Sequence, residues 1–576
     1  MAKSKNNIKK SIITINPFHY IHSLSKSSTN SSPKSLIFTP RKVSSASRNH
    51  QSLCSLSNLY LYFLFALTFF TLFEASNVTS FKPITDHYSI PLPCSSSSST
   101  SSSPYSISFS SSRSTLMVSS NEKNEDNTVR LSSSVVVPLP AHGVPSNSNV
   151  TEEEREFWKQ PNGGGYKPCL EFSIDYRRLS KDIVKEKTRF LVVVASGGLN
   201  QQRNQIVDAV VLARILKASL VIPILKVNLI WGDESEFSDI FDVEHFKRTL
   251  QADVRVVSSL PSTHIIARQL PEAKIPHGVS PFWIRSRFFK QLNEEGVLVL
   301  KGLDSKLSKN LLPDLQKLRC KVAFHALKFA APILELGNRL ARRMWIEGPY
   351  VAVHLRLEKD VWIRTGCRTG LGSKFDDIIV KERESRPEFL TGRLNISATQ
   401  RRLAGLCPLN AHEVARLLKG LGAPRSALVY SAGGEPFGGK LALKPLTTEF
   451  PNLMTKEMLA REGELSPFMN RSSALAAIDY IVSLSSDVFL ASHGGNMGSA
   501  MQGHRAYVGH RKYVKPNKRK MIPYFDQETS IPNSYEEFSG IMRYLHKGLQ
   551  GQPLSRNNKR GRDVIAYPVP ECMCRR

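Results

Sequence analysis

Three stretches of this chain have residue types and spacing suited to an anionic ligand, and the first is an apolar run that ends in cations. Val351-Ala-Val-His354-Leu-Arg356 predicts a buried strand of an α/β sheet, and such sheets bind ligands at the carboxyl ends of their strands. The Arg356 guanidinium offers a fixed fork of donors that fits a diphosphate, and His354 adds a second, shorter donor. The alternative interpretation is that Arg356 closes the strand with a surface ion pair.

The second stretch is a glycine turn, Gly197-Gly198-Leu-Asn-Gln-Gln-Arg-Asn204, which follows one expected strand and opens a helix. Glycine lets a ligand approach the backbone, and the start of a helix presents free N–H groups and a positive dipole. The turn is neither the Gly-x-Gly-x-x-Gly of dinucleotide sites nor the Gly-Lys-Ser/Thr of a Walker loop. A plain structural turn is the alternative interpretation.

The third stretch runs from Ser486 to Gly498 and continues into Gly503-His-Arg. Here a strand again ends in small residues before a helix begins, so free N–H groups are expected. Asp487 could accept hydrogen bonds from a base or a sugar, and Ser492 or His493 could contact phosphate. Alternatively, Asp487 is an ordinary turn residue between a helix and a strand.

Two motifs that resemble metal sites are incomplete. His412-Glu413 lacks the second histidine of a zinc protease site, because position 416 is Arg. Asp376-Asp377 is not an Asp-x-Asp at the end of a strand. We therefore expect no metal cofactor.

The elements that must position these stretches form two successive α/β series. The first contains a strand over 189–195, a helix with apolar residues from 206 to 216 and a strand over 220–223. The second begins at Tyr350 and adds expected helices and strands at 410–421, 427–431, 474–484 and 488–491. Two such series predict an α/β fold in which two Rossmann-like domains face a central cleft.

The N-terminal part of the chain has the pattern of a membrane-anchored secretory protein. Its first 50 residues include Lys and Arg but no acidic residue, and a mostly apolar run follows over 56–73. This order predicts a signal-anchor with a cytosolic N-terminus, although a transit peptide would also explain the first 50 residues. The Ser-rich segment after it predicts a flexible stem. The expected division is 1–53 cytosolic tail, 54–73 transmembrane anchor, 74–150 stem, 151–342 first domain, 343–545 second, donor-binding domain and 546–576 basic tail.

Charge, cysteine and glycosylation patterns agree with that organisation. The formal net charge of +29 favours phosphorylated or polyanionic partners, and no zinc-finger or RNP-type motif supports nucleic acid as a partner. In an oxidising lumen, some of the last six of the eight cysteines are expected to pair, with the connectivity open. Glycosylation sequons begin at Asn77, Asn149, Asn395 and Asn470.

Taken in order, the three stretches resemble the plant O-fucosyltransferase family, which is related to the GDP-fucose protein O-fucosyltransferases. The matching motifs are Gly-Gly-Leu-Asn-Gln-Gln-Arg, His-Leu-Arg-x-Glu-x-Asp, and Ser-Asp-Val-Phe with Gly-Asn-Met and Gly-His-Arg. Residues 431–439 are similar to the family's Gly-Glu-x-x-Gly-Gly segment, and the resemblance covers roughly 189–544. It implies a single-pass type II glycosyltransferase of the Golgi membrane, with a GT-B fold and metal-independent, inverting transfer from a nucleotide-sugar.

The resemblance also implies roles for individual residues. Arg356 would hold the departing diphosphate. The chemistry itself also calls for a general base, for which Glu358 and Asp360 are candidates by position, two and four residues beyond Arg356; the alternative is that both are ordinary loop carboxylates. Asp487 would recognise the nucleobase. The expected donor-binding set is Gly197, Gly198, Leu199, Asn200, Gln201, Arg203, His354, Leu355, Arg356, Asp487, Ser492, His493 and Asn496.

The expected reaction is transfer of fucose from GDP-fucose to a hydroxyl of a protein or a cell-wall glycan. Ser492, His493 and Gly494 depart from the family pattern, which has Thr and Tyr-Asp or Asn before Gly-Asn-Met. This departure leaves open another donor, such as UDP-rhamnose. A non-catalytic Golgi scaffold that assists polysaccharide synthesis is the other alternative.

Overall fold

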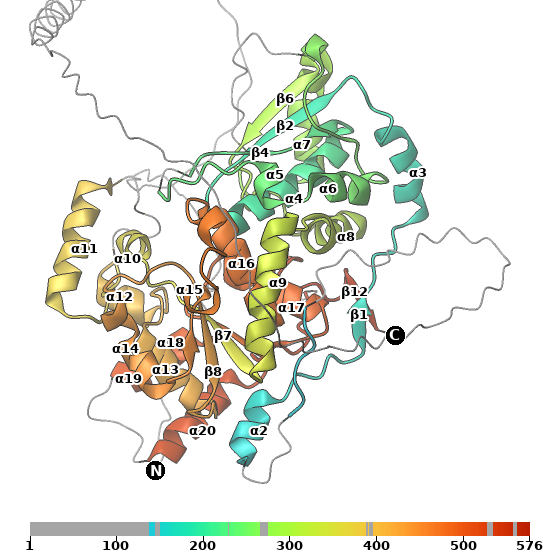
Figure 1. Cartoon of the computed structure of the whole chain (residues 1–576). Coiled ribbons are helices and arrows are strands. Elements are labelled where there is room, and N and C mark those ends of the chain that lie inside the picture. Colours follow the sequence, from blue (N-terminus) through green and yellow to red (C-terminus); the bar gives the residue numbers. More distant parts are fainter. Residues whose placement is uncertain are drawn as a thin grey trace, which may run out of the picture. The chain divides into compact units, whose positions relative to one another are not determined.

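The computed structural model describes residues 138–144, 150–228, 230–264, 275–387, 390, 396–526, 534–556 and 562–575 (Figure 1). The expected cytosolic tail and anchor, most of the stem, and the sequons at Asn77, Asn149 and Asn395 lie outside these residues. Asn470 is described and is exposed. Within the described ranges, no helix combines the length and the apolar character needed to cross a membrane.

The first sheet is parallel and is built around β2 (Phe190–Ala195), whose apolar side chains are almost entirely buried. One edge of β2 pairs with β6 (Val297–Lys301), and the other pairs first with β3 (Ser219–Val221) and then with β4 (Ile224–Leu225). Pro223 separates β3 from β4, because proline cannot donate a hydrogen bond to a neighbouring strand. β5 (Val256–Val257) pairs with β3.

The helix that follows the glycine turn, α4 (Leu199–Leu216), is buried on nearly all sides. It buries polar as well as apolar side chains, because it contacts β2, α7, α8 and α17. The other helices of this part are α3 (Ile174–Ile183), α5 (Phe237–Ile240), α6 (Val243–Leu250), α7 (Pro281–Glu295) and α8 (Pro313–Lys321), which continues into the π-helical turn η2 (Val322–Ala326). The preceding helix α2 (Glu152–Trp158) instead buries Phe157 and Trp158 in the core of the second sheet. The short 3-10 helix η1 covers Ser262–His264.

The second sheet is also parallel, in the order β11-β10-β7-β8-β9. Its register aligns Ala491, His354 and Ala432 at the carboxyl ends of the three central strands. The strands are β7 (Tyr350–His354), β8 (Leu428–Ala432), β9 (Leu453–Met454), β10 (Val488–Ala491) and β11 (Lys512–Val514).

Alternate residues of β7 enter two different hydrophobic cores, as the period of a strand requires. Val351 and Val353 pack with α13 and α20, whereas Tyr350 and Ala352 belong to a core that also contains the first sheet. In that larger core α9 and α16 pack together, and Gly337 permits the close approach because a Cβ there would lie 2.5 Å from Ile481 Cδ1.

The helices around the second sheet are mostly short. Their bounds are α9 (Ala331–Ile346), α10 (Lys359–Thr365), α11 (Ser373–Ser385), α12 (Ala398–Leu403), α13 (Ala411–Gly420), α14 (Lys440–Glu449), α15 (Lys456–Leu459), η4 (Ser466–Phe468), α16 (Ser472–Ser485), α17 (Asn496–Tyr507), α18 (Lys518–Met521), α19 (Pro523–Asp526) and α20 (Tyr535–His546). The expected domain limits at 342/343 and 545/546 fall inside α9 and α20.

The C-terminal segment packs back onto the N-terminal part of the described chain. β12 (Met573–Arg575) pairs antiparallel with β1 (Tyr166–Pro168). Disulfides join Cys169 to Cys574 and Cys320 to Cys572, while Cys367–Cys407 closes a shorter loop. The three bridges use the last six cysteines, whose connectivity the sequence left open.

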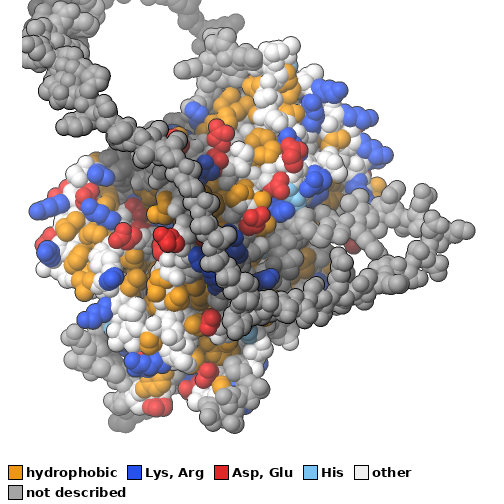
Figure 2. All heavy atoms as spheres, viewed as in Figure 1, with side chains coloured by type: hydrophobic (Ala, Val, Ile, Leu, Met, Phe, Trp, Pro, Cys, Tyr) orange, Lys and Arg blue, Asp and Glu red, His pale blue; other side chains and the backbone are white. Residues whose placement is uncertain are grey.

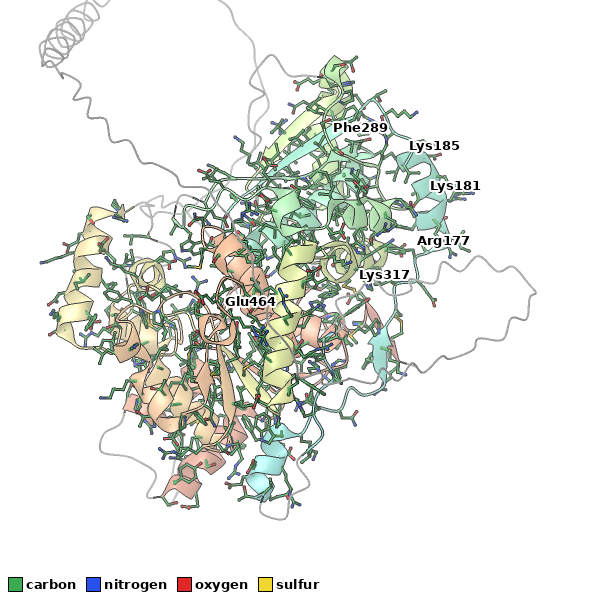
Figure 3. All side chains as sticks on the ribbon, in the orientation of Figure 1. Arg177, Lys181, Lys185, Phe289, Lys317 and Glu464 are labelled. Carbon is green, nitrogen blue, oxygen red and sulfur yellow. A yellow bond between two sulfur atoms is a disulfide. The ribbon has the colours of Figure 1, made fainter. Side chains whose placement is uncertain are left out.

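Charged side chains on the outside of the protein differ in how they are used. Arg177, Lys181 and Lys185 project outward along and just beyond α3, where Lys and Arg gather on the surface (Figures 2 and 3). Glu464, by contrast, accepts two hydrogen bonds from Arg343 of α9, at 2.6 and 2.9 Å (Figure 3). The first group is a solvated face, whereas the second ties a loop to a helix.

Candidate active site

The glycine turn after β2 has a conformation that its sequence requires. Gly197 has a φ of +88°, and a Cβ at this position would lie 2.3 Å from Gln201 Oε1. That same oxygen accepts a hydrogen bond from Gly198 N–H at 3.1 Å. Gln205 braces the turn by donating to the carbonyl of Ser196 at 2.7 Å. Gly197, Gly198 and Gln201 therefore fix the start of α4.

The segment that extends β7 is held by the residue that follows β10. Ser492 N–H donates to the His354 carbonyl at 3.0 Å, and Ser492 Oγ accepts from Arg356 N–H at 3.0 Å. Ser492 is fully buried. It therefore sets the backbone of the His354–Arg356 segment, whereas the sequence suggested that it could contact phosphate.

The side chain of Arg356 lies among carboxylates. Its Nε is 3.3 Å from Glu358 Oε2, and its Nη2 is 3.7 Å from Asp360 Oδ2. Arg364, one helical turn beyond Asp360, approaches the same Asp360 oxygen at 3.0 Å. Glu358 Oε1 accepts from Gly434 N–H at 3.1 Å, in the glycine-rich segment that follows β8. Two guanidinium groups thus share Asp360, and Glu358 links the loops after β7 and β8.

Two histidines beside Arg356 are neutral. Burial lowers the pKa of His354 to about 3, with the positive charges of Arg356 and Lys456 acting in the same direction. Burial, followed by the charges of Lys518, Arg356, Arg364 and His354, also holds the pKa of His493 well below its ordinary value. At neutral pH each ring therefore carries one N–H donor and one acceptor nitrogen.

Several buried polar atoms without a hydrogen-bond partner lie at this edge. The Nε of Arg356 makes an ion pair with Glu358 but no hydrogen bond. Buried polar atoms without a hydrogen bond are uncommon in protein interiors. Among the described residues at this edge, His354 Nδ1, Arg364 Nε and His493 Nδ1 have no hydrogen-bond partner, and Arg356 Nε, Glu358 Oε2 and Asp360 Oδ2 make ion pairs but no hydrogen bond. The arrangement fits a site that a polar, anionic ligand completes.

The glycine turn meets the second sheet through Asn200. Asn200 Nδ2 contacts Met497 Sδ at 3.3 Å, so the starts of α4 and α17 adjoin. Asn200 Oδ1 also accepts from Arg203 Nη1 at 3.1 Å. Asn496 is the first residue of α17 and is half-buried at the same junction. The structure therefore brings the second and third predicted stretches together.

Arg203 is not exposed to a ligand at this junction, which corrects the expectation from the sequence. Its guanidinium lies 4.4 Å from the centre of the Tyr480 ring, and its Nη2 donates to the Ala323 carbonyl at 3.1 Å. Leu199 and Leu355 are each only 3% exposed and pack in the cores. These three members of the expected donor-binding set support the site from within.

Asp487 also requires a correction, because it lies at the other end of the strand. It immediately precedes β10, so about five residues at ~3.3 Å each separate it from Ser492. Its carboxylate accepts from Tyr350 N–H at 3.0 Å and from His142 N–H at 2.7 Å, and it lies 3.0 Å from His142 Nδ1. Asp487 is a buried anchoring residue in this structure, remote from Arg356.

Three cations of this site were missed by the sequence-based interpretation. Arg364 had a usable signal, namely its four-residue spacing from Asp360 on a helix. Lys456 donates to the Gly433 carbonyl at 2.7 Å and pairs with Asp479 at 3.1 Å. Burial lowers the pKa of Lys518 to about 8, and its Nζ donates to the Cys407 carbonyl. The last two begin the short helices α15 and α18 in distant parts of the chain, and no local pattern marks them.

The described residues contain no group of three or more His, Cys, Asp or Glu side chains arranged to hold a metal ion. Positive charge at this edge is instead supplied by Arg356, Arg364, Lys456 and Lys518.

Comparison with known proteins assigns the chain to a family. The family model described as GDP-fucose protein O-fucosyltransferase matches residues 190–508. O-fucosyltransferase 37 of Arabidopsis thaliana is 70% identical over 77% of this chain and 78% of that protein. O-fucosyltransferase 20 of the same plant is 50% identical over 100% of this chain and 96% of that protein. A superposition on a crystal structure of POFUT1 in complex with GDP covers 57% of this chain and 99% of the POFUT1 chain, with 12% sequence identity and a TM-score of 0.34. The chain belongs to the O-fucosyltransferase family of plants and is a glycosyltransferase.

Proposed function

We propose that this enzyme transfers fucose from GDP-fucose to a hydroxyl group of a protein or a cell-wall glycan, with inversion at the sugar carbon and without a metal. The description of the matching family, which names GDP-fucose and protein O-fucosylation, supports the donor and the reaction. The names of the relatives support the same transferred sugar.

The observation that carries this proposal is the set of polar atoms around Arg356 that make no hydrogen bond. A diphosphate would replace Glu358 and Asp360 as the partner of the guanidinium groups of Arg356 and Arg364. Its oxygens would accept well-aligned hydrogen bonds where the carboxylates make long ion pairs. Preorganised donors at a leaving group stabilise the charge that develops in the transition state.

In the proposed reaction, the acceptor oxygen attacks the anomeric carbon of fucose as the bond from that carbon to the diphosphate oxygen breaks. GDP leaves with the bonding electrons, held by Arg356. The proton of the acceptor hydroxyl passes to a carboxylate. We assign this role to Glu358, because its Oε1 is fixed by Gly434 and its Oε2 makes only the 3.3 Å ion pair with Arg356, which a bound diphosphate would replace.

We further propose a GT-B-like arrangement in which the two sheets are the cores of two Rossmann-like domains and the donor lies between them. The parallel order of both sheets supports this arrangement. So does the contact between Asn200 and Met497, which joins the two helix starts.

The proposed location is the Golgi membrane, with a single-pass type II anchor and the folded part in the lumen. The basic residues before the apolar run at 56–73 support this orientation. Three disulfides support an oxidising compartment, and Asn470 offers an exposed glycosylation sequon.

The test is donor binding and turnover by the full-length chain with GDP-fucose, in parallel with other GDP- and UDP-sugars. Arg356→Ala is expected to lower turnover at least ~100-fold, by analogy with the loss of one preorganised donor. Arg177→Ala is the matched control, because this exposed arginine lies on α3. Unchanged donor binding and turnover in Arg356→Ala, or turnover of UDP-sugars alone, would contradict the proposal.

A further inference from the structure

An exposed apolar loop follows β4, next to the glycine turn. Trp231 is 41% exposed, Ile230 is 49% exposed and Val227 is 43% exposed. Of the five tryptophans in the chain, Trp158 and Trp362 are buried, and Trp283 and Trp345 are half-buried. Leaving an indole in water forgoes the favourable burial of a large apolar surface, so its exposure calls for an explanation.

The loop that carries Trp231 is held in place by polar contacts. Asn228 and Asp233 form a backbone bridge across its base, and the backbone N–H of Trp231 donates to the Asn228 carbonyl at 3.2 Å. The Asp233 carboxylate accepts from Ser473 N–H at 2.6 Å and from Ser472 Oγ at 3.0 Å. The loop is therefore attached to the start of α16, and Trp231 is presented on a fixed support.

The indole lies against the glycine turn itself. A Cβ added to Gly198 would lie 3.1 Å from Cζ3 of Trp231 and 3.4 Å from its Cη2. Gly198 precedes α4, whose residue Asn200 contacts Met497. The exposed indole is thus continuous with the junction at which the donor is proposed to bind.

We propose that Trp231 is the stacking platform for a pyranose ring of a carbohydrate acceptor. This inference rests on the proposed function and adds the class of the acceptor. A pyranose has a C–H face that packs on an aromatic ring and hydroxyls around its rim that need polar partners. The indole supplies the first, and the exposed Lys226 and Glu234 of the same loop can supply the second.

The position also explains why the acceptor would meet the donor. A sugar on the indole lies beside Gly198, and the turn at Gly197–Gly198 leads into the N-terminus of α4. Ile230 and Val227 extend the apolar surface along the loop, so a second ring of an oligosaccharide has a place to pack. A glycan would therefore bind along the loop with one hydroxyl directed to the junction of α4 and α17.

The direct test is the tryptophan fluorescence of the full-length chain loaded with GDP. Cellohexaose, xylohexaose, β-1,4-galactohexaose and a galacturonic acid hexamer are titrated separately, beside a Ser/Thr-containing peptide. At least one oligosaccharide is expected to change the emission of the unaltered chain and not that of Trp231→Phe. No change with any oligosaccharide, the same change in Trp231→Phe, or a Trp231-dependent response to the peptide alone would overturn the inference.

Kinetics with the oligosaccharide that responds provide the second measurement. Trp231→Ala is expected to raise the acceptor KM about tenfold, the upper range for loss of one aromatic stack, and to leave the donor KM unchanged. Gly198→Ala should raise the acceptor KM as well, because its methyl group displaces the indole. Phe282→Ala, which removes a 79% exposed ring on α7, is the matched control and should match the unaltered chain.

Hydrolysis of GDP-fucose without any acceptor separates the two proposals. If the unaltered chain neither binds nor hydrolyses GDP-fucose, the proposed function fails. If it does both and Trp231→Ala leaves the acceptor KM unchanged, only the inference about Trp231 fails.

Discussion

The two ends of the second sheet bury polar groups in different ways. Where β7 and β10 begin, the Asp487 carboxylate accepts from Tyr350 and His142, and both terminal nitrogens of Arg505 donate to backbone carbonyls, although its Nε has no partner. Where the same strands end, Arg356 makes long ion pairs, and His354 and His493 each keep an unpartnered ring nitrogen. The first end is buried and the second is half-buried, and the carboxylate at the first end is fully hydrogen-bonded whereas the carboxylates at the second make ion pairs.

This difference separates stability from function. A buried polar group that is fully bonded holds the fold together, whereas one left without a partner costs free energy until a ligand supplies it. Four predictions test the comparison, with the largest expected effect first.

The largest effect is expected at the satisfied end. Asp487→Ala leaves the Tyr350 N–H and His142 without their acceptor in a site where Asp487 is 1% exposed. The free energy of unfolding should fall by about 3–5 kcal/mol, the range for breaking a buried charged network. Chemical denaturation of the full-length chain measures it. Arg356→Ala is the contrast and should unfold at nearly the same denaturant concentration as the unaltered chain. A smaller loss from Asp487→Ala than from Arg356→Ala would reverse the comparison.

The next effect is catalytic and concerns the unsatisfied end. Glu358→Gln keeps the shape and the hydrogen bond from Gly434 but cannot take up the acceptor proton. Turnover should fall about 100-fold, the lower range for removal of a general base, while the affinity for GDP is retained. Steady-state kinetics with calorimetric GDP binding test both parts. Asp360→Asn is the matched variant, and a larger loss of turnover there would transfer the role of base to Asp360.

The third effect follows from the low pKa of His354, which is about 3 because of burial and nearby cations. In the unfolded chain this histidine takes up a proton below its ordinary pKa of about 6.5, whereas the folded protein does not until about pH 3. Its stabilising contribution is therefore complete above pH 6.5 and is lost as the pH falls from there toward 3. Between pH 7.5 and 5.5 the loss approaches about 1.4 kcal/mol.

His354→Gln removes this titration. Denaturation at the two pH values should show a drop in unfolding free energy that is smaller in the variant by about 1.4 kcal/mol. Equal drops in the two proteins would mean that His354 is not held neutral in the folded state. The difference between the two pH values is informative even if the variant is less stable at both.

Much of the fold could be predicted from the sequence, because its elements have strong local patterns. The strand at 189–195 matches β2, and the helix and strand at 474–484 and 488–491 match α16 and β10. The apolar run ending at His354 and the glycine turn at Gly197 were also placed correctly at strand ends. These features depend on residues close together in the chain.

The roles of Asp487 and Arg203 could not be predicted in this way. Whether Asp487 faces a ligand depends on its lying before β10, and its partner His142 is 345 positions away. Arg203 sits one turn into α4, but Tyr480 and Ala323 from distant segments cover it. The same limit applies to Lys456 and Lys518, which long-range packing brings toward His354 and His493.

The smallest effect is expected from Ser492, which is itself fully hydrogen-bonded but belongs to the end of the sheet that holds Arg356. Its Oγ is bonded and fully buried, yet its partner is the backbone of Arg356. Ser492→Ala leaves that N–H without an acceptor, which should cost about 1 kcal/mol of unfolding free energy. Because Arg356 is then less firmly placed, the KM for GDP-fucose should rise a few-fold, whereas Ser492→Thr, which retains a hydroxyl, should restore it. If Ser492→Ala lowers stability without changing the KM, the hydrogen bond from Arg356 N–H to Ser492 Oγ supports only the fold. The groups that serve the donor would then begin with the Arg356 side chain.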